Sequence, residues 1–245
     1  MKIIYDKENT NFGIYVDRII NTDPYYRKLS NLELNFKEKE IKLINYNYKS
    51  GVKVNISFKN EVNNDFKKIF KKKGATVLDC TAGFGRDSYI LAKYGFSVTM
   101  IEKNPITTLL LNNSIGKLLG GTEVYNRLKL IHGDSYDYLK LCDKQYDYIY
   151  IDFMFNKLKN SPLSSKNDET LKLISDDKEN RMKLLNLAKK KCKDKVIIKN
   201  YKYSPSITGI TPDYQIKTKL LNYYIFLSEY GSIKENIWCY PSKKE

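Results

Sequence analysis

Near-continuous apolar runs alternate with amphipathic segments from Ala75 onward. Runs typical of buried strands occur at residues 75–80, 96–102, 127–134, 146–155 and 194–200. Segments whose apolar residues recur at helical spacing lie between them, at residues 85–95, 105–120 and 181–192. Apolar strands separated by amphipathic helices are typical of a parallel sheet covered on both faces. The pattern therefore predicts an α/β fold for this part of the chain.

The two ends of the chain have different patterns. Short runs rich in β-branched and aromatic residues predict a small β-rich N-terminal extension, at residues 12–20, 32–36, 40–48 and 52–58. Apolar residues at helical spacing from Val62 to Phe70 predict a helix that ends near Gly74. Residues 214–241 predict two strands around Tyr230-Gly231, an antiparallel edge hairpin. We expect an extension over residues 1–73 and a main domain over residues 74–245.

Composition excludes some classes of protein. At 245 residues with 42% hydrophobic content, the chain suits one main globular core. No run reaches the 18 or so apolar residues of a membrane span, and the polar N-terminus does not resemble a signal peptide, so a cytoplasmic location is expected. We also expect a monomer. Four scattered cysteines and a single histidine suggest neither a metal site nor a disulfide framework.

The chain is strongly basic. Its 43 Lys and Arg against 28 Asp and Glu give a formal charge of +15, which would attract polyanions through counterion release. Lys, Asn, Ile and Tyr are all abundant, as AT-rich codon usage would produce in any protein. Charge alone therefore leaves nucleic-acid binding and a basic composition without function equally open.

A turn with two glycines leads from a strand into a helix in VLDCTAGFGRDSYILAKYGF, residues 77–96. Such a turn, here at Gly83 and Gly85, brings backbone N–H groups and a positive helix end close to a nucleotide-like ligand. The dinucleotide fingerprint has a third glycine where this chain has Ser88. Asp79 precedes the turn, and a carboxylate would repel a pyrophosphate but can hold an ammonium group. The turn favours a cationic cofactor without phosphate, such as S-adenosylmethionine.

Two more carboxylates end the strands that follow. Glu102 lies 17 residues after Gly85, where a carboxylate can accept hydrogen bonds from both ribose hydroxyls, although NAD enzymes share this feature. A solvated charge is the alternative. Asp134 ends the strand in LIHGDS, residues 130–135, at the edge where open α/β sheets bind ligands. Asp134 can contact an adenine amino group or cap a helix, and both roles stay open.

The segment YIYIDFMF, residues 148–155, ends a buried strand in a carboxylate followed by aromatic residues. Methyl transfer to an exocyclic amine needs an acceptor for its N–H and an aromatic face for the base. Asp152 and Phe155 are candidates for these two catalytic roles. For Phe155, packing under a loop is an equally good interpretation.

Basic and aromatic residues are interleaved near the same predicted sheet edge. Candidate contacts to phosphates and bases are Lys199, Tyr201 and Lys202 after the fifth strand, and Lys157 and Lys159 after Asp152. Solvated lysines are the alternative. The only histidine, His132, alternates with apolar residues, and we interpret it as a near-core residue rather than a general base.

With these motifs in order, the chain resembles class I S-adenosylmethionine-dependent methyltransferases. More narrowly it resembles the RsmJ family, which methylates the exocyclic N2 of a guanine in small-subunit (16S) ribosomal RNA. The resemblance covers about Gly74 to Leu227 and includes a D-x-T-A-G-x-G-R-D pattern at residues 79–87. It implies a Rossmann-like, seven-stranded, mostly parallel sheet, S-adenosylmethionine as cofactor, and 16S rRNA or the small ribosomal subunit as partner.

The resemblance also implies roles for single residues. Cofactor-binding positions would be Asp79, Thr81, Gly83, Gly85, Arg86, Asp87, Glu102, Asp134 and Ser135. Asp152 would be the carboxylate on the acceptor side, and Lys199 matches the first residue of the family's K-R-P-x-Y segment. No metal is implied.

The chain departs from the family pattern at two places. The family has D-P-M-F/Y-P after its acceptor-side Asp, whereas this chain has Phe153 and Asn156 instead of both prolines. A basic, glycine-rich H-R-R-K-F-G-G-G segment is replaced by residues 56–74. Three alternatives follow: a methyltransferase for another acceptor, such as DNA adenine or protein, a nicotinamide-dependent oxidoreductase, and a non-catalytic RNA-binding descendant.

Overall fold

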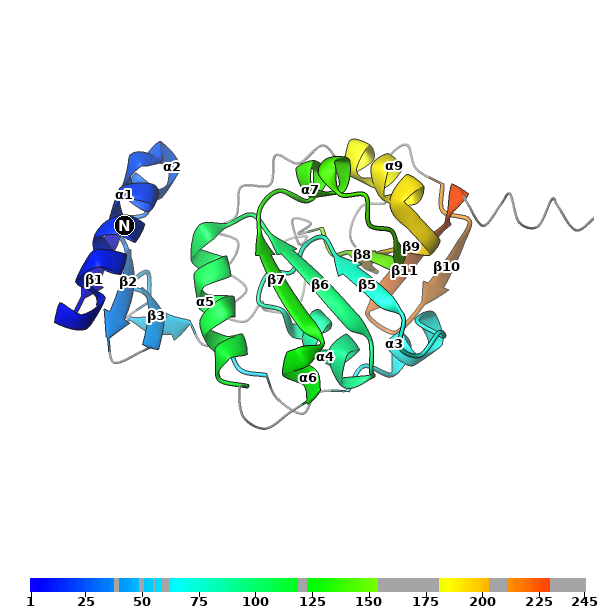
Figure 1. Ribbon diagram of the computed structural model, residues 1–245, viewed down its shortest axis with the longest axis horizontal. Helices are drawn as coiled ribbons and strands as arrows, with labels where there is room; N and C mark the ends of the chain where they lie inside the picture. The colour runs from blue at the N-terminus through cyan, green and yellow to red at the C-terminus, as the bar shows by residue number, and fades with distance from the viewer. Residues whose placement is uncertain are drawn as a thin grey trace, which may run out of the picture.

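The computed structural model describes residues 1–37, 40–48, 51–54, 56–58, 62–118, 123–153, 181–202 and 211–229. Within these residues the chain forms two sheets, one from the N-terminal part and one from the rest (Figure 1). The strands of the second sheet are β5 (Thr76–Asp79), β6 (Ser97–Glu102), β7 (Leu128–His132), β8 (Tyr146–Ile151), β9 (Cys192–Tyr201), β10 (Tyr214–Lys217) and β11 (Leu221–Leu227).

The order of strands in this second sheet is β10-β11-β9-β8-β5-β6-β7. β5, β6, β7, β8 and β9 pair in parallel, whereas β11 pairs antiparallel with β9 and with β10. The predicted seven-stranded, mostly parallel sheet with an antiparallel C-terminal hairpin is confirmed. The chain runs outward from β5 in both directions, so the carboxyl ends of β5 and β8 lie at a topological switch point, where open α/β sheets bind ligands.

The structure forms a hairpin earlier in the chain than the predicted one. The structure places the turn after β10, where Thr218 N–H donates to Leu221 O at 2.8 Å. What reads as one strand from residue 214 to residue 227 is therefore two strands joined by a tight turn. No Gly, Pro or Asn marks this turn in TKLL, so the sequence offered little to find it. Tyr230-Gly231 lies outside the described residues.

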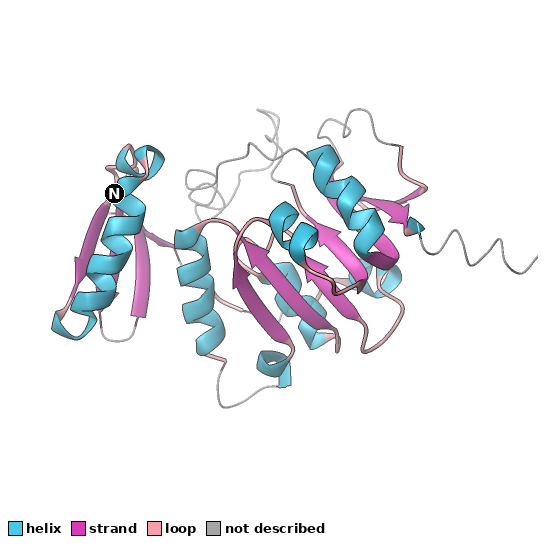
Figure 2. Cartoon of the chain, turned by 45° about the horizontal axis from the view of Figure 1, so that its top comes forward, coloured by secondary structure: helices cyan, strands magenta, loops and turns pink. Residues whose placement is uncertain are grey.

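Helices cover both faces of the second sheet (Figure 2). One face carries α3 (Asn64–Ile69), α4 (Arg86–Lys93) and α6 (Glu123–Asn126), and the other carries α7 (Ser135–Leu141) and α9 (Arg181–Lys191). Helix α5 (Pro105–Gly116) packs along β6 and β7. α3 ends at Ile69 with Phe70 as its C-cap, so Gly74 does not end it as predicted.

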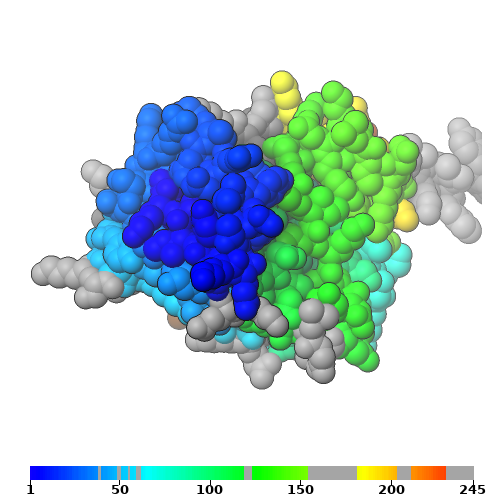
Figure 3. All heavy atoms as spheres, turned by 60° about the vertical axis from the view of Figure 1, so that its left-hand side comes forward, coloured from blue at the N-terminus to red at the C-terminus, as the bar shows by residue number. Residues whose placement is uncertain are grey.

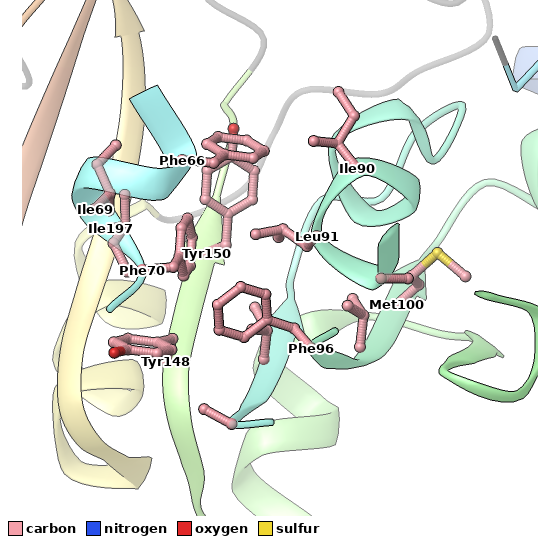
Figure 4. Packing of buried hydrophobic residues seen from close by; sticks show 14 of the residues in the cluster. Phe66, Ile69, Phe70, Ile90, Leu91, Phe96, Met100, Tyr148, Tyr150 and Ile197 are labelled. Carbon is pink, nitrogen blue, oxygen red and sulfur yellow. The ribbon is translucent and has the colours of Figure 1, made fainter. Parts of the chain in front are cut away.

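Aromatic side chains fill the core between α3 and the sheet (Figure 4). The ring of Phe66 lies 5.7 Å from that of Tyr150, and the ring of Phe70 lies 5.2 Å from that of Tyr148, both edge to face. All four residues are buried, and each such aromatic pair adds roughly 1 kcal/mol beyond the area buried. This packing fixes the end of β8 that carries Asp152.

The N-terminal unit, which we define as residues 1–54, forms the other sheet. It contains β1 (Lys2–Tyr5), β2 (Leu32–Lys37), β3 (Glu40–Asn45) and β4 (Val52–Val54), with the short helices η1 (Lys7–Asn9) and α2 (Pro24–Arg27) and the longer α1 (Thr10–Thr22). The predicted strand at residues 12–20 is wrong, since these residues lie in α1. Val16 and Ile20, one helical turn apart, are buried, whereas Ile14 is 38% exposed. Helical periodicity therefore outweighed the β propensity of this run.

The N-terminal unit packs against the second sheet through α5. Val16 and Ile20 of α1 share one apolar cluster with Ile106 and Leu110 of α5 and with Phe84 of the glycine turn. The space-filling view shows the unit lying directly against the rest of the molecule (Figure 3). Among the described residues, none of the helices has the length and apolar character needed to cross a membrane.

Candidate cofactor and acceptor site

The glycine turn between β5 and α4 has the backbone that its sequence predicts. Gly83 and Gly85 have φ angles of +53° and +71°, in the left-handed region that favours glycine. The N–H of Gly85 donates to Ala82 O at 2.7 Å, which closes the turn. A Cβ at Gly85 would lie 2.6 Å from Leu111 Cδ1 of α5. The turn therefore packs so closely on α5 that a side chain at this position would clash.

Asp79 stabilises this turn through buried hydrogen bonds. Its side chain is buried and accepts hydrogen bonds from Ser88 Oγ at 2.6 Å and from Thr81 N–H at 3.0 Å. Burial raises the pKa of Asp79 to about 7, although both hydrogen bonds act in the opposite direction. Ser88, at the position of the third fingerprint glycine, therefore supplies a hydroxyl for a buried carboxylate.

Glu102 ends β6 beside the turn. One carboxylate oxygen accepts the N–H of Gly83 at 2.8 Å, and the other accepts the N–H of Asn104 at 2.7 Å. The carboxylate is half-buried at the carboxyl edge of the sheet, where open α/β sheets bind ligands.

Asp134 and Ser135 form the next corner of the site. Asp134 is the N-cap of α7 and accepts the N–H groups of Tyr136 and Asp137 at 2.8 and 3.2 Å. The helix-cap alternative for Asp134 is therefore confirmed, and its half-buried carboxylate still lies at the sheet edge. Ser135 Oγ donates to Cys80 O at 2.5 Å, which ties α7 to the end of β5.

Lys199 of β9 connects two carboxylates at the switch point. Its Nζ lies 2.7 Å from Asp87 Oδ2 and 2.8 Å from Asp152 Oδ2. Tyr150 Oη donates to the same Asp87 oxygen at 2.6 Å. The N–H of Asp152 donates to Thr81 Oγ1 at 2.6 Å, so the acceptor-side carboxylate is joined to the glycine turn. Four sequence-predicted residues (Thr81, Asp87, Asp152 and Lys199) thus meet in one cluster.

Electrostatics keep this cluster charged. Burial alone would raise the pKa of Asp87, but the charge and hydrogen bond of Lys199 outweigh it and hold this pKa below its usual value. Burial also opposes the charge on Lys199, yet Asp152 and Asp87 together raise its pKa well above the usual value. Burial, followed by the charges of Asp87 and Asp152, raises the pKa of Tyr150 well above its usual value, so its hydroxyl stays protonated.

The other predicted residues lie around this centre or outside the described chain. Arg86 is exposed at the start of α4, and Tyr201 and Lys202 are exposed at the end of β9. Phe155, Lys157 and Lys159 fall outside the described residues. His132 is exposed rather than near the core, and its Nε2 lies 3.1 Å from Lys103 O.

Sequence reasoning missed two residues that shape the site. Tyr150 precedes Asp152 by two positions in β8, and the two-residue period of a strand places both on one face, so the signal was present. Asn104 caps α5 through Ile106 N–H and Thr107 N–H, and Asn-Pro at a helix start is a recognised N-cap pattern.

The residues at the switch point fit S-adenosylmethionine better than a dinucleotide. The side chains around the glycine turn are mainly carboxylates, and the cation Lys199 is already held by two of them. Such a surface repels a pyrophosphate and attracts the positive sulfonium and ammonium groups. Glu102 is a half-buried carboxylate at a strand end, the kind of acceptor that ribose hydroxyls require. Within the described residues, no cluster of His, Cys, Asp and Glu could hold a metal ion.

The sheet order and this site together define a class I methyltransferase. A family model described as "Putative SAM-dependent methyltransferase" matches residues 22–228. A ribosomal RNA small subunit methyltransferase J from Coxiella burnetii (strain Dugway 5J108-111) is 37% identical over 154 residues, 62% of this chain and 60% of that protein. A protein of the same name from Pseudoalteromonas translucida (strain TAC 125) is 30% identical over 167 residues, 66% of each chain.

The chain therefore belongs to this family of S-adenosylmethionine-dependent methyltransferases, and the curated relatives it is similar to carry the name ribosomal RNA small subunit methyltransferase J. The match spans about 60% of the length of the Coxiella relative. The crystal structure of a SAM-dependent methyltransferase from Neisseria gonorrhoeae shares the fold, with a TM-score of 0.68, 22% identity, and coverage of 94% of this chain and 97% of that chain.

Proposed function

We propose that the chain transfers a methyl group from S-adenosylmethionine to the exocyclic N2 of a guanine in small-subunit ribosomal RNA. The observation that carries this proposal is the position of Asp152, a half-buried carboxylate at the end of β8 whose N–H is bound by the glycine turn. The names of the curated relatives supply the substrate class. Three expectations remain predictions: the cytoplasmic location, the monomeric state, and the division into an extension over residues 1–73 and a main domain over residues 74–245.

The proposed cofactor site uses the carboxylates at the strand ends. Glu102 would accept hydrogen bonds from the ribose hydroxyls, and Asp134 would lie beside the adenine. Gly83 and Gly85 would let the backbone approach the ligand closely, and Ser88 and Asp79 would hold the turn in place. When bound, S-adenosylmethionine supplies an activated methyl group.

On the acceptor side, Asp152 would accept an N–H hydrogen bond from the guanine amine and orient its lone pair toward the methyl group. Positioning of the two reactants supplies most of the acceleration in such a reaction. The amine loses its extra proton after transfer, so the site needs no strong base. This is consistent with a centre built from ionised carboxylates and without histidine.

The structure favours a different role for Lys199 from the phosphate contact predicted from the sequence. Its Nζ is held by Asp87 and Asp152, and its side chain is only 14% exposed. We assign it to positioning Asp152 and keeping that carboxylate ionised. Tyr201 and Lys202, exposed at the end of the same strand, remain candidates for contact with RNA, as do Phe155 for stacking and Lys157 and Lys159 for phosphates.

Labelled methyl transfer to three polymers tests this function. Purified protein and labelled S-adenosylmethionine are incubated with small-subunit RNA from cells that lack the RsmJ-type enzyme, with DNA, and with ribosomal protein. We expect label in the RNA alone. Label in DNA or protein would identify another acceptor, and salt-dependent RNA binding without any transfer would indicate a non-catalytic RNA-binding protein.

A matched variant separates catalysis from binding. Asp152→Asn keeps the size of the side chain and removes its charge. We expect transfer to fall by roughly 10²-fold or more, with nearly unchanged affinity for S-adenosylmethionine. Loss of cofactor affinity in this variant would contradict the assignment of Asp152 to the acceptor side.

A further inference from the structure

The N-terminal unit reaches the cofactor side of the sheet through a buried hydrogen bond. Tyr26 of α2 accepts the side-chain N–H of Asn104 at 2.9 Å, across 78 residues of sequence. Both side chains are buried, with Tyr26 9% and Asn104 4% exposed. A buried amide donor that loses its acceptor costs free energy, so this bond constrains the orientation of Asn104.

Asn104 in turn holds the carboxylate that ends β6. Its side-chain oxygen caps α5 by accepting Ile106 N–H at 2.9 Å and Thr107 N–H at 3.0 Å. Its backbone N–H donates to Glu102 Oε1 at 2.7 Å, and the other oxygen of Glu102 accepts Gly83 N–H at 2.8 Å. A continuous set of hydrogen bonds therefore runs from Tyr26 to the glycine turn.

A second contact links the same two parts of the molecule. Phe84, between the two turn glycines, is buried in one apolar cluster with Val16 and Ile20 of α1. The N-terminal unit thus shares an apolar cluster with the glycine turn and also forms a hydrogen bond with Asn104, which binds Glu102. Two independent contacts converge on the cofactor side of the sheet.

We propose that Tyr26 is a positioning residue of the cofactor site. By holding Asn104, it aims the Glu102 carboxylate at the ribose hydroxyls, and the N-terminal unit is thereby part of the cofactor site. This inference rests on the proposed role of Glu102 in binding S-adenosylmethionine. It assigns a function to a segment that sequence reasoning treated as a separate extension.

Calorimetric titration with S-adenosylmethionine tests the inference without any RNA substrate. Tyr26→Phe removes one hydroxyl, and we expect the Kd to rise about fivefold, the effect of losing one buried hydrogen bond. Tyr15→Phe is the matched control, because Tyr15 lies in the same unit and is 61% exposed. An unchanged Kd in folded Tyr26→Phe would overturn the inference.

A double-mutant cycle identifies the route of the effect. The Kd for S-adenosylmethionine is compared between Glu102→Gln and the double variant Tyr26→Phe/Glu102→Gln. If Tyr26 acts through Glu102, the fivefold rise in Kd caused by Tyr26→Phe should disappear in this background. The same loss in both backgrounds would mean that Tyr26 acts through general stability, which would overturn the inference.

Amide hydrogen exchange of the cofactor-free protein gives a second readout. We expect faster exchange at Gly83 and Asn104 in Tyr26→Phe, with distant strands such as β9 unaffected. Faster exchange everywhere would contradict a local positioning role. Failure of the unchanged protein to bind S-adenosylmethionine would overturn the proposed function and this inference together, whereas equal binding by both proteins would overturn only this inference.

Discussion

Lys199 shows how the fold changes the meaning of a residue. In the sequence it belongs to a run of cations and aromatics, which suggests contact with a polyanion. In the structure it lies between two carboxylates, one of them 112 positions away in the chain. Their positions at strand ends made Asp152 and Glu102 candidate site residues, because a carboxylate after an apolar run is unusual. The ion pairs of Lys199 depend on contacts between distant segments, which no local pattern encodes.

Removing the charge of Lys199 should change the pH dependence of the reaction. In Lys199→Met, two carboxylates face each other without their cation, so ionisation of the pair becomes less favourable. We expect the acid limb of the methyl-transfer profile to move to higher pH, and stability to fall by about 3 kcal/mol. Lys199→Arg keeps the positive charge, so its pH profile of methyl transfer should stay close to that of the unchanged protein. Equal profiles for Lys199→Met and Lys199→Arg would contradict the positioning role.

Asp79 gives a prediction about stability. Its pKa in the folded protein is raised to about 7 by burial, so its contribution favours folding below about pH 4 and is lost as pH rises to about 7. Asp79→Asn removes this titration. The variant should therefore gain stability relative to the unchanged protein between these pH values, by on the order of 2–4 kcal/mol. Denaturant unfolding at several pH values measures this, and a difference independent of pH would contradict it.

At the scale of elements, apolar periodicity predicted the sheet well and the N-terminal unit less well. The parallel strands are continuous apolar runs between helical segments, which is an unambiguous signal. Residues 12–20 mix β-branched residues with helical spacing, and burial of Val16 and Ile20 in one apolar cluster favours the helix. The glycine turn was predictable because its chemistry is local. The hairpin turn before β11 was missed because its residues are not typical turn formers.

A pair of glycines with equal φ angles tests the packing of the turn. Gly85→Ala should cost about 2–3 kcal/mol, because it adds a close contact with Leu111 to the backbone strain at φ +71°. Gly74→Ala has the same strain at φ +70° but nothing within 4 Å of its Cβ, and should cost about 1 kcal/mol. Only Gly85→Ala should also weaken S-adenosylmethionine binding. Equal losses of stability in thermal unfolding would show that the contact with Leu111 is unimportant.

At the scale of the whole molecule, two parts that the sequence separates form one structure. The second sheet brings the predicted carboxylates to a single edge, and the N-terminal unit shares an apolar cluster with Phe84 of the glycine turn at that edge. The whole chain has a formal charge of +15, which suits a protein that attracts RNA, whereas the carboxylates at this edge suit a cationic cofactor. Composition predicted the charge, but only the fold shows that the centre itself is rich in carboxylates.

The central claim is that Asp152 directs a methyl group to guanine N2. The most direct measurement is nucleoside analysis by mass spectrometry of small-subunit RNA after reaction with S-adenosylmethionine. We predict N2-methylguanosine with the unchanged protein and its loss with Asp152→Ala. A methyl group on another atom or another base, or N2-methylguanosine at an undiminished level with Asp152→Ala, would contradict the account.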